Sequence, residues 1–281
     1  MNEWYNDEYV LLSPKLDIVF KRLFTDNLYL LRCLVSDLLN IPRQNTQNLV
    51  LMNNEVLPDM PKGKMSRLDL RLEVDGKAVN IEIQIRRHRD YAERALFYWA
   101  KLFTSSLKSG EEYGQLKKTI TVNIVDFDLF SDKNVFHSEV VAVIRGTDKI
   151  FCDKESIHFF ELSKIDGMPD PVNRQKLWLQ FLNVRNEEDL KMIENTETEE
   201  MKQASDALRR LSLERDLQAS ALLREMELHD EASLRAEGRE EGREEGREEG
   251  REEARKEMRK AIMNKMRQLG YSESQIQEIF A

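Results

Sequence analysis

A short stretch of the sequence, residues 67–84 (RLDLRLEVDGKAVNIEIQ), contains two carboxylates at positions where they can meet. Its Asp75–Gly76 pair is a strong signal for a two-residue β-hairpin turn. A turn there sets an antiparallel register in which Asp69 lies opposite Glu82. Directly opposed like charges destabilise a sheet, because their Cβ atoms lie about 4.5–5.5 Å apart. Either flanking arginines neutralise the pair, or the pair binds a divalent cation such as Mg²⁺.

Apolar and polar residues alternate on both sides of this turn. The apolar side chains would share one face of the hairpin, and the other face would carry Asp69, Glu82 and Gln84. The same alternation is typical of any half-buried hairpin whose polar face is solvated. The pattern therefore predicts the two strands. It leaves open whether the polar face is an ordinary wet surface or a metal site.

The elements around the hairpin predict a mixed α/β region. Helical periodicity indicates two helices between residues 13 and 41 and a strong helix over residues 89–110. Apolar and β-branched runs predict strands over residues 48–57, 118–127, 135–146 and 156–165. The order helix, three strands, helix, strand, then extra strands predicts a mixed sheet flanked by helices.

The strand signals stop at Pro171, and the rest of the chain is predicted to be helical. Residues 238–253 are four copies of GREE, with Ala254 at the next glycine position. Gly costs a helix about 1 kcal/mol relative to Ala, and Glu–Arg pairs return only roughly 0.2–0.5 kcal/mol each. The repeat is therefore either a helix, alone or self-associated, or a flexible charged spacer. Gly270 and a Ser272–Gln275 capping box predict two short helices at the C-terminus.

Composition limits the function classes. The net charge of −9 is unevenly divided, since residues 1–150 are balanced and residues 151–250 carry the acidic excess. The balanced first part neither argues for nor excludes a nucleic-acid partner. No apolar run is long enough for a membrane span, and the acidic N-terminus is unlike a signal peptide. Cys33 and Cys152 are expected to be free thiols in a reducing cytoplasm.

Several segments, in this order, resemble the recombination-promoting nuclease / putative transposase family of the PD-(D/E)XK nuclease superfamily. They are SPKLDIVFKRLF, the hairpin RLDLRLEVDGKAVNIEIQ, RALFYWAKLFTSSLKSGEEYGQLKKTITVNIVDF and the GREE tail. The resemblance implies an α/β, restriction-endonuclease-like core with a mixed central sheet, followed by an all-helical C-terminal region.

The resemblance also implies roles for individual residues. Asp69 and Glu82 match the metal-binding carboxylates, and the main-chain carbonyl of Ile83 would be a third ligand. Gln84 stands where the wider superfamily has lysine, although this family commonly has Gln there. It would orient an attacking water as a neutral hydrogen-bonding group. Asp17 would either add an acid to the site or pair locally with Lys21. The implied cofactor is Mg²⁺, with Mn²⁺ or Ca²⁺ as alternatives.

Three arginines are candidates for binding substrate phosphates. Arg86 and Arg87 directly follow the hairpin, where they would hold phosphates or form a solvated entrance to the next helix. Arg94 matches a family position and would support the site or contact substrate. Tyr98 and Trp99 of the same predicted helix are expected to belong to the core. The four histidines are scattered, so a zinc site is not expected.

Four regions are expected: a nuclease-like domain over residues 1–168, a helical region over 169–235, a repeat helix or linker over 236–260, and a short helical hairpin over 261–281. The expected function is metal-dependent endonucleolytic hydrolysis of DNA, linked through the resemblance to recombination, mobile elements or defence against foreign DNA. The alternative is a nucleic-acid-binding or scaffold protein with little or no activity, which assembles through its helical tail. DNA and further copies of the chain are the expected partners, and a membrane is not.

Overall fold

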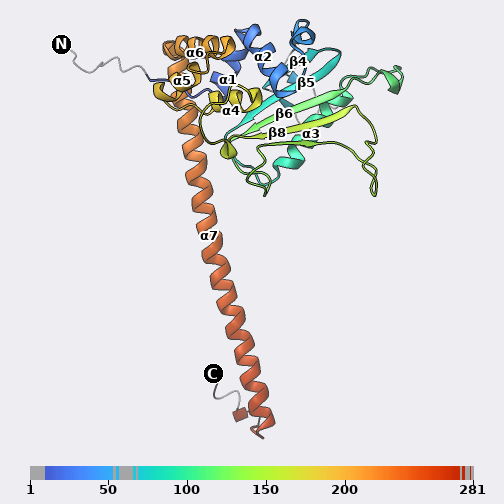
Figure 1. The fold of residues 1–281 in the computed structure, drawn as a ribbon. Helices are drawn as coiled ribbons and strands as arrows, with labels where there is room; N and C mark the ends of the chain where they lie inside the picture. The colour runs from blue at the N-terminus through green and yellow to red at the C-terminus, as the bar shows by residue number, and fades with distance from the viewer. Residues whose placement is uncertain are drawn as a thin grey trace, which may run out of the picture. The chain divides into compact units, whose positions relative to one another are not determined.

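The protein is described by a computed structural model, which covers residues 10–52, 55–56, 66–67, 69–272, 274–275 and 279. The chain divides into two compact units, Met1–Leu222 and Leu223–Ala281. The first unit holds a six-stranded mixed sheet, a cluster of helices beside it, and the helix α3 apart from that cluster (Figure 1). The predicted mixed α/β core is therefore confirmed.

The hairpin forms at the predicted place. Strand β4 (Leu70–Val74) pairs antiparallel with β5 (Lys77–Gln84), and the register runs from Val74↔Lys77 to Leu70↔Ile81. Asp75 and Gly76 make the turn, with φ values of 51° and 71°. Two successive positive φ values are typical of the hairpin turn whose twist matches the strands. The predicted register is confirmed, but β4 begins one residue after Asp69.

The strand order of the main sheet is β1-β4-β5-β6-β8-β7. The parallel centre consists of β5, β6 (Thr119–Val125) and β8 (Glu155–Glu161), and the edges β1 (Val50–Leu51) and β7 (His137–Val140) are antiparallel. All residues of β6 are buried, as expected for a central strand covered on both faces. A separate pair of short strands, β2 (Glu55–Val56) and β3 (Ser66–Arg67), precedes β4.

Among the described residues of the first unit, six helices precede α7 (Arg215–Gln268). Their bounds are Asp17–Thr25 for α1, Leu28–Leu38 for α2, Tyr91–Thr104 for α3, Arg174–Leu182 for α4, Glu187–Glu194 for α5 and Glu199–Ser212 for α6. The chain also forms three 3₁₀ turns, Arg43–Thr46, Tyr113–Gln115 and Leu162–Lys164. None of the described helices has the length and hydrophobicity needed to cross a bilayer.

The core of the helical cluster is aromatic. Phe20 and Phe24 of α1 lie with their ring centroids 4.8 Å apart, and Phe24 lies 5.9 Å from Trp178 of α4. These three side chains are fully buried. Each contributes about 1.5–3 kcal/mol by burial, so α1 is firmly held against α4. This packing positions the polar face of α1.

A chain of polar side chains joins the last two strands of the sheet. His137 Nε2 lies 2.9 Å from His158 Nδ1, and His158 Nε2 lies 2.8 Å from Ser156 Oγ. The Ser156 hydroxyl donates to Glu139 Oε1 over 2.6 Å, so it accepts from His158, which in turn accepts from His137. The expectation that the histidines are scattered is wrong for this pair, because β7 and β8 bring them together.

Stability is expected to fall in acid because of this chain. Burial lowers the pKa of His158 from 6.5 to about 4, with Glu139 opposing the shift and His137 and Lys118 adding to it. Neutral His158 therefore stabilises the fold fully above pH 6.5, and this contribution is lost as the pH falls through 4. A loss of about 2–3 kcal/mol in the free energy of unfolding should appear in urea titrations over that range. His158→Gln should make the free energy of unfolding less dependent on pH over this range. His229→Gln, at an exposed position, should leave that dependence unchanged.

The second unit is built on the long helix α7, Arg215–Gln268 (Figure 1). The GREE repeats lie inside this helix. Of the two predicted alternatives, a helix or a flexible spacer, the structure shows the helix. A Cβ added at any of the four repeat glycines meets no atom within 4 Å. After α7, Gly270 adopts a φ of 90°, and Ser272 and Gln275 exchange the two bonds of the predicted capping box.

Replacing the four repeat glycines by alanine is expected to strengthen α7. Each change adds about 0.5–1 kcal/mol of helix stability, because Gly loses more backbone entropy on folding than Ala and the added methyl groups meet no obstacle. Hydrogen exchange of the amides in residues 236–252 should slow accordingly. Gly270→Ala is the matched control and should destabilise its segment, because its positive φ disfavours any side chain.

Candidate active site

Asp69 lies in the bend that leads into β4. Its Oδ2 atom accepts the main-chain N–H of Ile83 over 3.0 Å, and its Oδ1 atom lies 2.8 Å from the ammonium of Lys21. The residue is 9% exposed. The N–H of Ile83 is part of the strand edge that faces β4, so the Asp69 carboxylate takes the place of a carbonyl in the ladder. Asp69 is therefore fixed to β5 although it lies outside the paired strand.

Glu82 lies on β5 and is 8% exposed. Its Oε1 atom accepts a hydrogen bond of 3.0 Å from the side-chain amide of Asn80. The pKa of Glu82 is raised from 4.5 to about 7, chiefly by burial and next by the negative charge of Asp69. Asn80, Arg94 and the main-chain N–H of Asp69 act in the opposite direction. The hairpin thus brings the two predicted carboxylates into electrostatic contact.

The polar face of the hairpin is covered rather than wet. Asn80 and Glu82 are buried, as are Thr121 and Asn123 at the same height on β6. The hydroxyl of Tyr91, the first residue of α3, donates to Asn123 Oδ1 over 3.3 Å. An ordinary solvated surface is therefore excluded for these residues, because α3 packs over them.

A cation that contacts Asp69 comes from α1 and not from Arg71 of the hairpin. Arg71 extends away to the hydroxyl of Ser105, at 3.4 Å, and the side chain of Arg67 lies outside the described residues. The cation is Lys21, from α1, which the sequence suggested only as a local partner of Asp17. Because Asp17 precedes Lys21 by four residues, the two residues lie on the same side of α1.

The remaining predicted residues lie at the carboxyl end of β5. Gln84 is half-buried, and its main-chain carbonyl accepts the N–H of Asp126 over 3.0 Å. Arg86 follows the strand, is half-buried, and has a buried Nη1 atom without a hydrogen-bond partner in the described part of the chain. Arg87 is exposed. The three residues surround the end of the strand that carries Glu82.

Arg94 approaches the carboxylate pair from α3. Its guanidinium lies 5.2 Å from the centre of the Tyr98 ring, and its charge lowers the pKa of Glu82. Trp99, on the same helix, packs against the apolar cluster of α3 and the sheet and donates to the carbonyl of Thr119 over 3.0 Å. Trp99 is thus a core residue, as expected, whereas Arg94 belongs to the surroundings of the carboxylates.

The chemistry of these groups fits one divalent cation. Two carboxylates and a main-chain carbonyl are hard oxygen donors, and Mg²⁺ keeps several waters when only one or two carboxylates bind it. The raised pKa of Glu82 and the ammonium at Asp69 both indicate a place that attracts positive charge. Within the described ranges, no cluster of three or more His, Cys, Asp or Glu side chains could hold a metal.

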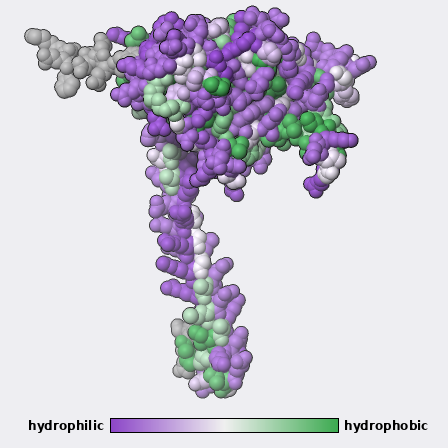
Figure 2. All heavy atoms as spheres, viewed as in Figure 1, coloured by the Kyte–Doolittle hydropathy of each residue, from purple (hydrophilic) through white to green (hydrophobic). Residues whose placement is uncertain are grey.

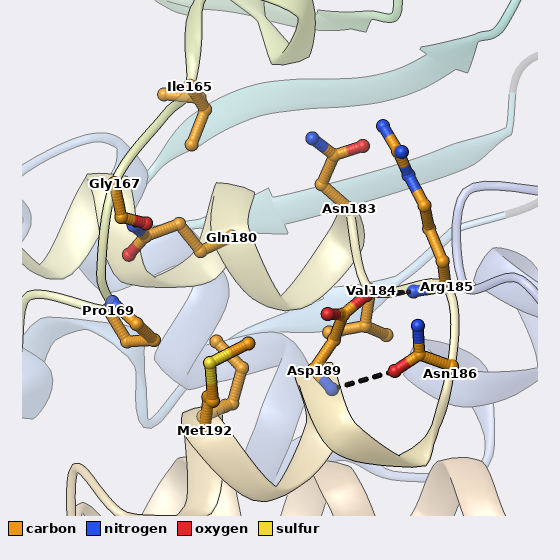
Figure 3. Close-up of a pocket in the computed structure, with 11 residues that line it drawn as sticks. Ile165, Gly167, Pro169, Gln180, Asn183, Val184, Arg185, Asn186, Asp189 and Met192 are labelled. Atoms are coloured by element: carbon orange, nitrogen blue, oxygen red, sulfur yellow. Dashed lines mark hydrogen bonds between the residues drawn. The ribbon is translucent and has the colours of Figure 1, made fainter.

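A pocket of about 310 Å³ lies elsewhere, between the end of α4, the start of α5 and the segment before α4 (Figure 3). Polar side chains of this pocket form hydrogen bonds to nearby main-chain groups. Gln180 donates to the carbonyls of Gly167 and Met168, and Asp189 accepts the N–H of Arg185 over 2.9 Å. This pocket offers no pair of catalytic groups, so the carboxylate pair remains the candidate site.

The chain belongs to the PD-(D/E)XK nuclease family transposases, since the model of that family matches residues 14–238. The match includes α1, the hairpin, α3 and the whole main sheet, which are the elements that surround the carboxylate pair. Searches of curated proteins and of solved structures found no match. Family and fold together define a nuclease or transposase-related protein with an α/β core and a helical tail.

Proposed function

We propose that this protein is a metal-dependent endonuclease that hydrolyses phosphodiester bonds of DNA. The observation that carries the proposal is the buried pair Asp69 and Glu82, which the hairpin register brings together beside a lysine. A nearby like charge is costly in a purely structural site. It is useful where a cation must be bound.

Asp69, Glu82 and the carbonyl of Ile83 would hold the cation, which we take to be Mg²⁺, with Mn²⁺ or Ca²⁺ as alternatives. When bound, such a cation lowers the pKa of water and stabilises negative charge on a phosphate. In hydrolysis, a water oxygen bonds to phosphorus, one ester P–O bond breaks, and the leaving oxygen takes up a proton. Gln84 would orient the attacking water through a hydrogen bond, and Asn80 would hold Glu82 in place.

Substrate binding is assigned to the three arginines around the site. Arg86 and Arg87 would neutralise phosphates next to the cleaved bond, and Arg94 would act from α3. Asp17, on the same side of α1 as Lys21, would add a further acid to the site.

Cleavage of supercoiled plasmid tests the proposal. Wild-type protein should nick the plasmid with Mg²⁺ and stop when EDTA is added, whereas Asp69→Ala and Glu82→Ala should leave the plasmid supercoiled. Glu73→Ala is the matched control, because Glu73 lies on the same hairpin but in an exposed ion pair with Lys117. Equal nicking by all four proteins would sink the assignment.

A second candidate function is assembly of several copies through α7. The last part of this helix exposes the apolar side chains of Met258 and Ile262, and Leu269 directly after the helix is exposed as well. Figure 2 shows apolar residues gathered in this region. Sedimentation equilibrium of wild-type protein and of Ile262→Glu tests this function. A monomer at all concentrations for both proteins would contradict it.

A further inference from the structure

We propose that Lys21 is a catalytic residue, which supplies from α1 the positive charge that Gln84 does not provide. This inference rests on the proposed nuclease function and assigns one more residue to the same site. The ammonium would contact the phosphate that is cleaved, while Gln84 orients water. The role was hidden in the sequence, because 48 positions separate Lys21 from the aspartate that it contacts.

The position of Lys21 is the first argument. Its Nζ atom lies 2.8 Å from Asp69 Oδ1, at the carboxylate proposed to hold the cation. The other oxygen of that carboxylate is bonded to the main chain of β5. Packing of Phe20 and Phe24 holds α1 in place, so the lysine is presented by a rigid element. Its four-carbon stem still lets the ammonium move over a few ångströms.

The chemistry of the reaction is the second argument. Negative charge grows on the phosphate oxygens as water attacks, and a neutral amide gives that charge only a dipole. Lys21 carries a full charge at the same carboxylate pair. Among the other basic residues near the pair, Arg94 stacks on Tyr98 and Arg71 reaches Ser105. Arg86 and Arg87 are assigned to phosphates next to the cleaved bond, so they are not placed at the carboxylate pair itself.

Charge balance suggests how the lysine would act. Without a divalent cation, the ammonium neutralises Asp69 directly. A divalent cation bound to Asp69 would repel the ammonium from that carboxylate and leave it free for a phosphate oxygen. Lys21 would therefore compete with the cation for Asp69 while assisting the chemistry. A lysine that only fixes the position of the Asp69 side chain would neither compete with the cation nor assist the chemistry.

The test compares Lys21→Gln with wild type in two measurements on the full-length protein. Calorimetric titration with Mn²⁺ alone gives the affinity for the cation, and cleavage of supercoiled plasmid at saturating Mn²⁺ gives kcat and KM. We expect kcat to fall about 10²–10³-fold with little change in KM, as for the loss of one transition-state contact. The Mn²⁺ affinity should stay the same or become tighter.

Two further variants sharpen the comparison. Lys21→Gln/Gln84→Lys returns the charge to the position that the wider superfamily uses, and it should recover at least about tenfold of the lost kcat. Arg22→Gln is the matched control, since Arg22 is the next residue on α1 and its ion pairs involve Asp26 and Glu214. Its cleavage should equal that of wild type.

The outcomes separate the two proposals. If wild type cleaves, Asp69→Ala does not, and Lys21→Gln cleaves like wild type, then Lys21 has no catalytic role and the nuclease function stands. If wild type and Asp69→Ala cleave equally, the nuclease function itself fails. A loss of kcat matched by weaker Mn²⁺ binding would overturn the inference, because Lys21 would then only hold Asp69 in place. Failure of the double variant to exceed Lys21→Gln would also count against it.

Discussion

Glu82→Gln is expected to abolish cleavage and, at the same pH, to stabilise the fold. At pH 8 the wild-type carboxylate is ionised although it is buried next to Asp69. Its pKa is raised from 4.5 in the unfolded chain to about 7 in the folded protein. The contribution of Glu82 to the free energy of unfolding is therefore complete only below pH 4.5. Stability then declines as the pH rises through 7, by about 2–3 kcal/mol in all. Glutamine removes the charge and can still accept the hydrogen bond from Asn80.

Urea unfolding at two pH values tests this prediction. Glu82→Gln should exceed wild type by about 1–3 kcal/mol at pH 8 and differ little at pH 4.5, where Glu82 is already protonated. Cleavage should fall at least about 10³-fold, since a cation ligand is lost. Glu73→Gln, at an exposed position of the hairpin, is the control for both measurements. A Glu82→Gln protein that is less stable than wild type at pH 8 would contradict the burial argument.

Glu161→Ala is expected to destabilise the fold strongly. Glu161 and Lys164 form an ion pair of 2.6 Å, and their side chains are 0% and 2% exposed. The other oxygen of Glu161 accepts the main-chain N–H groups of Leu129 and Phe130. Alanine would leave the buried ammonium with the carbonyl of Phe130 but without its carboxylate, and two partly buried N–H groups without their acceptor, at a cost of about 3–5 kcal/mol.

Thermal and urea unfolding of Glu161→Ala should show this loss directly. Lys117→Ala is the matched control, because it removes a pair of similar length, 2.7 Å to Glu73, between side chains that are about 40% exposed. That change should cost less than about 1 kcal/mol. Equal effects of the two substitutions would show that burial does not decide the strength of these pairs.

Local signals explain what could be predicted from the sequence. The Asp75–Gly76 turn and the alternation around it predict the hairpin and its register, because both depend on residues within a few positions of each other. The buried strand β6 and the helix α3 are also marked by their own composition and periodicity. The start of α1, predicted at residue 13, was wrong. The helix begins at Asp17 with no side-chain cap, and the chain forms a turn after Ser13 instead.

Contacts between distant segments explain what could not be predicted. The insertion of β8 between β6 and β7 depends on how the chain crosses over, which no local pattern encodes. The His137–His158 pair arises from this strand order, and the Lys21–Asp69 contact arises from the packing of α1 beside the hairpin. The burial of Asn80 was missed for a different reason. A polar residue in an alternating strand suggests a wet face, whereas here α3 covers it.

The charge balance of the carboxylate pair has a practical consequence for handling the protein. Lys21 neutralises Asp69, and Glu82 holds a proton in part of the molecules near neutral pH. We therefore expect the chain to fold without a bound cation, in contrast to small metal-nucleated domains that chelators denature. Purification in EDTA should give a folded protein that can be loaded with DNA first. Cleavage could then be started by rapid mixing with the cation, so that a single turnover is observed from a preformed complex.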